Sequence, residues 1–143
     1  MTELTLAKAN AITATSLAKG EQAGFKPLAV AVFDAGGHLK AFQKQDGASM
    51  LRFEIASGKA YGALAIGMGS RALDKIAAER PHFVAGLNAV SGGRIVPVPG
   101  GVLIRDQAGV LLGAVGITGD TSDNDELAAV TGIEAAGFVA QTA

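Results

Sequence analysis

The stretch LAVAVFDAGGHLKAFQK, residues 28–44, predicts a β-hairpin and decides the fold class. Its first six residues form a continuous apolar run with β-branched side chains, which is typical of a buried strand. The sequence DAGG at 34–37 is a strong turn signal, and residues 38–44 form the returning strand. On that strand Leu39 and Ala41 are expected to share the drier face, because alternate residues of a strand point the same way.

A second hairpin is predicted further along the chain. Residues 101–105 and 110–118 are expected to be strands on either side of the turn DQAG. The stretch from Arg94 to Val98 is predicted to be one more strand, at a sheet edge, because its proline cannot donate to a ladder of hydrogen bonds. Together these segments predict five antiparallel strands.

Helices are predicted before and between the hairpins. Thr5 is expected to cap a helix over residues 6–23, which Gly24 ends. A second helix is predicted over residues 50–66, with Ser49 as its cap. Two glycines inside the second helix indicate close packing against another backbone rather than chemistry.

The remaining segments are less regular. Ser70 is expected to open a short helix that ends before Pro81. The following stretch, 82–93, has no clear hydrophobic period and is predicted to be a long loop. The last helix is predicted over residues 123–141, with Ser122 as its cap.

The predicted element order is therefore α-ββ-α-βββ-α, in one domain that covers residues 1–143. Helices interrupt antiparallel groups of strands instead of alternating with single strands, which argues against a parallel sheet. The fold class is α+β.

Composition excludes several functions and favours one assembly. The net charge of −1 provides no field that would attract nucleic acid or an anionic membrane. Cysteine is absent, so disulfides, thiolate metal sites and a cysteine nucleophile are excluded. No signal peptide or membrane-spanning run is recognised, and a cytoplasmic location is expected. A surface rich in small apolar residues and poor in charge favours a homo-oligomer over a compact monomer.

Four segments, in order and with few gaps, resemble the GlcG/HbpS family: AVFDAGGHLKAFQKQDGA (31–48), EIASGKA (54–60), GGRIVPVPGGVLI (92–104), and LLGAVGITGD (111–120) followed by DNDELAA (123–129). The family includes proteins encoded beside glycolate oxidation genes, haem-binding proteins and the C-terminal domain of a corrinoid adenosyltransferase. The resemblance implies a profilin-like three-layer α/β/α fold with a five-stranded antiparallel sheet. It also implies homo-oligomers, and haem or a corrinoid as ligand.

Three cations are candidates for binding an acidic ligand. Arg52 and Lys59 are seven residues apart on the second predicted helix and therefore share one face, which either receives carboxylates or is simply solvated. Arg94 would be held on a stiff strand. Gly100 and Gly101 are expected either to let a ligand approach the backbone closely or to serve an ordinary turn.

The candidates for metal ligation or proton transfer are few. His38 and His82 are the only histidines, so they are the first candidates for the ligand of a haem iron if haem is bound. Tyr61 and the three methionines could also ligate haem but are expected to be core or surface residues. The same histidines, or Glu54, are the candidates for catalytic proton transfer. Each of them is also compatible with a purely structural or exposed position.

Two other patterns carry no predicted site. Four acidic residues surround the start of the last predicted helix, where the helix dipole favours them without any metal: Asp120, Asp123, Asp125 and Glu126. The spaced glycines at 113, 116 and 119 lie inside a predicted strand, so they are not a dinucleotide-binding turn.

Two functions follow from these residues. The first is a homo-oligomeric protein that binds a planar molecule bearing carboxylates, such as haem or a corrinoid. The alternative is a cofactor-free enzyme, of the lyase or isomerase type, that moves a proton on a small organic or aromatic acid in a catabolic pathway. A scaffold without a ligand is the third reading of the same residues.

Overall fold

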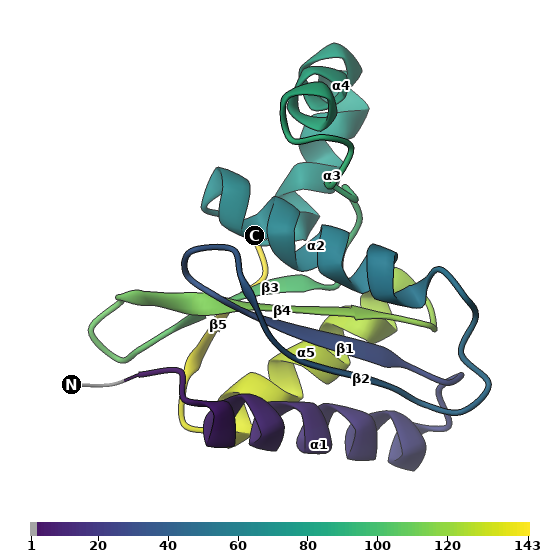
Figure 1. The fold of residues 1–143 in the computed structure, drawn as a ribbon, viewed down its shortest axis with the longest axis vertical. Coiled ribbons are helices and arrows are strands. Elements are labelled where there is room, and N and C mark those ends of the chain that lie inside the picture. Colours follow the sequence, from purple (N-terminus) through teal and green to yellow (C-terminus); the bar gives the residue numbers. More distant parts are fainter. Residues whose placement is uncertain (1–2) are drawn as a thin grey trace.

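The structure is a computed structural model that describes residues 3–143, and Figure 1 shows its ribbon. In this part of the chain the helices are α1 (Leu6–Ala23), α2 (Arg52–Ile66), α3 (Ser70–Glu79), α4 (Pro81–Val90) and α5 (Ser122–Ala135). The strands are β1 (Ala29–Asp34), β2 (Leu39–Lys44), β3 (Gly101–Arg105), β4 (Leu111–Thr118) and β5 (Val139–Gln141). They form one antiparallel sheet in the order β2-β1-β4-β3-β5. The predicted α+β class with a five-stranded antiparallel sheet is confirmed.

The fold has three layers (Figure 1). Helices α1 and α5 lie on one face of the sheet and α2 on the other, while α3 and α4 project beyond α2. The core between the sheet and α1 and α5 is built of large aliphatic side chains, among them Ile12, Leu28, Val30, Ile117 and Ile133. The core under α2 is made mostly of small side chains, because three alanines of the helix rest directly on the strands.

The fifth strand is not where the sequence predicted it. The stretch from Arg94 to Val98 is not a strand, because its amides bond to helices instead of a neighbouring strand: Ile95 N donates to Asn88 Oδ1 and Val96 N to the carbonyl oxygen of Gly58. The edge strand beside β3 is instead β5, which follows α5 in the chain.

The ends of two helices also differ from the prediction. Helix α5 ends at Ala135 rather than near residue 141, since Gly137 has a φ of +86° and turns the chain out of the helix. Its cap is Thr121, whose Oγ1 accepts the backbone N–H of Asn124. Helix α2 begins at Arg52, and the hydroxyl of Ser49 bonds to the Arg52 side chain rather than capping the backbone.

The predicted loop over 82–93 is largely the helix α4. Pro81 occupies the first turn, where its missing N–H costs nothing. The sequence showed no helical period here because α4 packs only against α3 in the described part of the chain. Most of its apolar side chains therefore do not line a buried face. We call α3 and α4 together the arm (Figure 1).

The first hairpin carries a bulge that the sequence did not predict. Val32 pairs with Ala41 but Phe33 pairs with Leu39, so Lys40 is the extra residue. Leu39 therefore lies on the α2 side of the sheet and Ala41 on the α1 side. The expectation that these two residues share a face was wrong, because a bulge shifts the alternation by one residue.

Candidate functional site

Arg52 and Lys59 share a face of α2, as helical spacing requires, but that face is turned toward the sheet. Lys59 is only 2% exposed, and its Nζ lies 3.0 Å from Asp125 Oδ2 and 2.9 Å from the carbonyl oxygen of Ile117. Arg52 donates through Nη1 to Thr118 Oγ1 at 2.7 Å. Both cations are thus bound to internal partners at the end of β4.

Asp125 is the counter-ion of Lys59 as well as part of the first turn of α5. It is 1% exposed, and its second oxygen accepts the backbone N–H of Asp120 at 2.9 Å. Burial raises the pKa of Asp125, and the positive charge of Lys59 opposes that rise. Burial likewise lowers the pKa of Lys59, and the negative charge of Asp125 opposes that fall. Gly100 and Gly101, which the sequence offered as ligand-binding candidates, instead lie against the buried side of Lys59.

The opposite side of α2 borders a cleft of about 460 Å³, which we call the α2 cleft. Its walls are the β1–β2 hairpin, the outer face of α2, and the segment 93–96 that follows the arm. The lining residues are Phe33, Gly37, Leu39, Phe53, Glu54, Ile55, Ser57, Gly58, Tyr61, Gly93, Arg94 and Val96. Most of this lining is apolar or aromatic.

Two helical glycines bring the third wall close to α2. A Cβ on Gly58 would collide with the side chain of Val96 and lie 3.1 Å from the carbonyl oxygen of Arg94. A Cβ on Gly62 would lie 3.1 Å from Ile95. The prediction of close packing against another backbone is confirmed at Gly58, which meets the carbonyl oxygen of Arg94, whereas Gly62 meets only the side chain of Ile95. The packing at Gly58 places Arg94 at the cleft.

Arg94 and Tyr61 form the polar end of the cleft. The guanidinium carbon of Arg94 lies 4.4 Å from the centre of the Tyr61 ring, a cation–π distance. Arg94 Nε donates to the carbonyl oxygen of Ser91 at 2.7 Å, which fixes the orientation of the guanidinium. Ser57 contributes a hydroxyl that is buried and has no hydrogen-bond partner in the described part of the chain.

The two histidines lie outside the α2 cleft. His38 follows the hairpin turn, with Nδ1 3.3 Å from Asp34 Oδ1 and most of its side chain exposed. The backbone N–H of His38 also donates to Asp34 and holds the pKa of that carboxyl below its ordinary value. His82 is exposed on α4. Of the predicted site residues, the fold brings Glu54 and Arg94 together at the cleft.

Sequence reasoning gave Tyr61 only as a minor candidate for a haem ligand, and it did not select Ser57 or the two phenylalanines of the cleft. The signal that could have found them was the spacing of Phe53, Ser57 and Tyr61, which are four residues apart and so form one stripe along α2. That stripe lies on the cleft side of α2, away from the buried face that carries Arg52 and Lys59.

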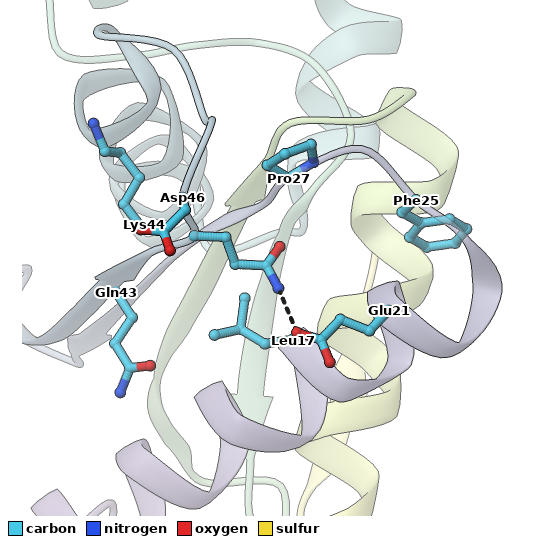
Figure 2. A pocket seen from close by; sticks show the side chains of 8 residues that line it. Leu17, Glu21, Phe25, Pro27, Gln43, Lys44 and Asp46 are labelled. Atoms are coloured by element: carbon cyan, nitrogen blue, oxygen red, sulfur yellow. Dashed lines mark hydrogen bonds between the residues drawn. The ribbon is translucent and has the colours of Figure 1, made fainter.

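A second groove, of about 520 Å³, lies between the end of α1 and the edge strand β2 (Figure 2). Leu17 and Glu21 enter from α1, and Gln43, Lys44 and Asp46 from β2 and the turn after it. Gln45 Nε2 donates to Glu21 Oε1 at 3.3 Å across it. Its lining is mostly polar and charged, whereas that of the α2 cleft is mostly apolar or aromatic, so the α2 cleft is the better candidate site.

Residues 3–143 contain neither a metal cluster nor a membrane-spanning helix. No group of three or more histidine or acidic side chains is placed to hold a metal ion among these residues. Within the same range, none of the helices has the length and apolar character to cross a membrane.

Fold and cleft together define a profilin-like, three-layer α+β domain with an apolar cleft beside its central helix. Residues 4–134 match the family described as haem degrading protein HbpS-like, and the chain belongs to this family. The predicted resemblance to GlcG/HbpS proteins is confirmed.

Individual relatives agree with this assignment. The crystal structure of a PduOC:haem complex has a TM-score of 0.85 at 25% identity, covering 96% of this chain and 97% of that one. The crystal structure of HbpS has a TM-score of 0.80 at 26% identity, covering 94% and 91%. An uncharacterized 15.0 kDa protein from the dhaT-dhaS intergenic region of Citrobacter freundii is 31% identical over 108 residues, which are 76% of this chain and 75% of that protein.

Proposed function

We propose that this protein binds haem in the α2 cleft. The observation that carries the proposal is the combination of an apolar, aromatic lining with one oriented guanidinium, that of Arg94, at its polar end. A haem presents a large apolar plane and two propionates, so it needs these two kinds of contact. Haem is favoured over a corrinoid because the PduOC relative was solved with haem.

The cleft residues fit such a ligand. The cleft volume of about 460 Å³ falls in the range of about 300–1,000 Å³ that is usual for small-molecule sites. Phe33 and Phe53 offer apolar surface to a planar ring. The Arg94 guanidinium uses Nε for Ser91, so its terminal nitrogens are available to a carboxylate. When bound, haem would supply redox and oxygen chemistry at its iron.

The rival hypothesis of a cofactor-free enzyme has less support. It assigned proton transfer to His38, His82 or Glu54, and neither histidine lines the cleft, although His38 lies between Gly37 and Leu39, which do. Glu54 lines the cleft but is exposed, without the burial that tunes a carboxylate for general-base catalysis.

Haemin titration, followed by visible absorption, tests the proposal. Wild type should bind one haemin per chain, and Arg94→Ala should weaken binding by about 1.5–3 kcal/mol, the usual value of a charge-assisted hydrogen bond. Arg80→Ala is a matched control, because Arg80 stacks on Phe83 at 4.7 Å in the arm, outside the cleft. Circular dichroism checks that both variants fold. Absence of haemin binding by wild type, or equal affinity of wild type and Arg94→Ala, would contradict the proposal.

A further inference from the structure

The α2 cleft contains few side chains that can bind an iron ion. Both histidines and the described methionines, Met50 and Met68, are absent from its lining. The oxygen donors that line it are the phenol of Tyr61, the carboxylate of Glu54 and the hydroxyl of Ser57. Among the side chains that line the cleft, the candidate iron ligands of the same chain are therefore these oxygen donors.

Tyr61 is the donor that the fold holds in place. A Cβ on Gly37 would lie 3.8 Å from the Tyr61 ring, and the φ of +81° at Gly37 favours glycine there. The guanidinium carbon of Arg94 lies over the ring, 4.4 Å from its centre. The phenol oxygen has no protein hydrogen bond in the described residues, yet it is not among the side-chain oxygens shielded from solvent. The ring is thus fixed while its oxygen stays accessible.

The other two oxygen donors are less suitable. Glu54 is exposed and belongs to the first turn of α2, where the helix dipole already stabilises its charge. The Ser57 hydroxyl is neutral, and its oxygen is shielded from solvent. A phenolate is an anionic oxygen ligand, and tyrosine holds the haem iron in catalases.

We propose that Tyr61 is the protein ligand of the haem iron in the α2 cleft, with Arg94 stacked on its ring as the residue that positions it. This inference rests on the proposed function. Binding forms one bond from the phenol oxygen to ferric iron, displaces a water ligand, and releases the phenolic proton to solvent, so no oxidant or reductant is needed. The cation of Arg94 offsets the negative charge that the phenolate brings into the cleft.

Tyr61→Phe isolates this role, because it removes the oxygen and keeps the ring. The wild-type haemin complex should show the phenolate-to-iron charge-transfer band, together with phenolate modes in its resonance Raman spectrum. In Tyr61→Phe both should vanish, and haemin affinity should fall by about tenfold or more, the scale on which even a metal site's outer partners act. His38→Ala and His82→Ala are controls that should keep the wild-type spectrum.

Metal-free protoporphyrin IX separates iron ligation from packing. Wild type and Tyr61→Phe should bind this porphyrin equally, since neither can form an iron–oxygen bond with it. Equal losses of affinity for haemin and for the porphyrin would overturn the inference, because Tyr61 would then act by packing alone. A haemin spectrum that changes in a histidine variant but not in Tyr61→Phe would also overturn it. In both cases the proposed haem binding would stand, whereas wild type that binds neither compound would refute both proposals.

Discussion

At the scale of single residues, the most unusual feature is the buried ion pair between Lys59 and Asp125. The pair joins α2 to the start of α5 across the end of β4, and both side chains are almost completely buried. Each charge has a further partner in the backbone, Ile117 for the lysine and Asp120 for the carboxylate. Such a pair is costly to bury and still more costly to break, because the remaining charge has no water to replace its partner.

Asp125→Ala should therefore reduce the free energy of unfolding by about 3–5 kcal/mol. The double variant Lys59→Met/Asp125→Leu, which removes both charges, should be more stable than Asp125→Ala. Arg71→Ala is the control, since Arg71 pairs with Glu126 at 3.0 Å in a partly exposed position, where the expected loss is about 0–1 kcal/mol. Urea denaturation measures all three. If the double variant were the least stable, the burial argument would be wrong.

At the scale of secondary-structure elements, the close seating of α2 on the sheet depends on glycines in the strands. Gly116 of β4 faces the backbone of α2, and a Cβ there would collide with the carbonyl oxygen of Ala56. Gly101 of β3 meets the backbone of Lys59 in the same way. The obstacle is backbone in both cases, so the helix itself must move if a side chain is added.

Gly116→Ala is expected to destabilise the fold by about 1–3 kcal/mol or more, because overpacking at this contact shifts α2. Gly86→Ala provides the control with the same chemical change. Gly86 lies inside α4, and a Cβ added to it would meet no atom of a neighbouring element within 4 Å, so alanine there should stabilise the helix by about 0.5–1 kcal/mol. Thermal unfolding followed by circular dichroism distinguishes the two. A stability of Gly116→Ala equal to wild type would show that α2 is not seated through this glycine.

At the scale of the whole molecule, the arm presents exposed apolar side chains. Val90 is 86% exposed, and Phe83 is 37% exposed although Arg80 stacks on its ring, while α4 rests on α3 alone. Met50, two residues before α2, is 84% exposed. Burial of these side chains between copies would remove apolar surface from water, which agrees with the homo-oligomer expected from composition.

We expect light scattering after size-exclusion chromatography to give a multiple of the 14.3 kDa subunit mass. The paired substitution Phe83→Lys/Val90→Lys should shift the protein toward smaller species, since charges cannot be buried in an apolar contact. Val110→Lys is the control, because Val110 is an exposed apolar residue of the β3–β4 turn, on a different element. A wild-type mass near 14.3 kDa at micromolar concentration would contradict the expected assembly.

The parts of this protein that the sequence alone determined are those stabilised by neighbours along the chain. Helix α1 begins after Thr5 and ends before Gly24 as predicted, and both hairpins lie where the turn signals placed them. Turn geometry and the capping bond of Thr5 act over a few residues, so they can be read locally, whereas a bulge shifted the predicted alternation of Leu39 and Ala41. The family resemblance was recognisable for the same reason, because its motifs are short segments in these turns and strands and at the starts of α2 and α5.

Only the tertiary structure decided which face of α2 is buried and where the cleft lies. Helical spacing placed Arg52 and Lys59 on one face of α2 but could not say whether that face is buried or exposed. In the structure this face packs against the sheet, where Lys59 pairs with Asp125 and Arg52 donates to Thr118. Residues far apart in sequence, such as Phe33, Tyr61 and Arg94, meet at the cleft because glycines let separate segments approach one another. Burial and close packing depend on all of these segments at once, and no local pattern of residues encodes them.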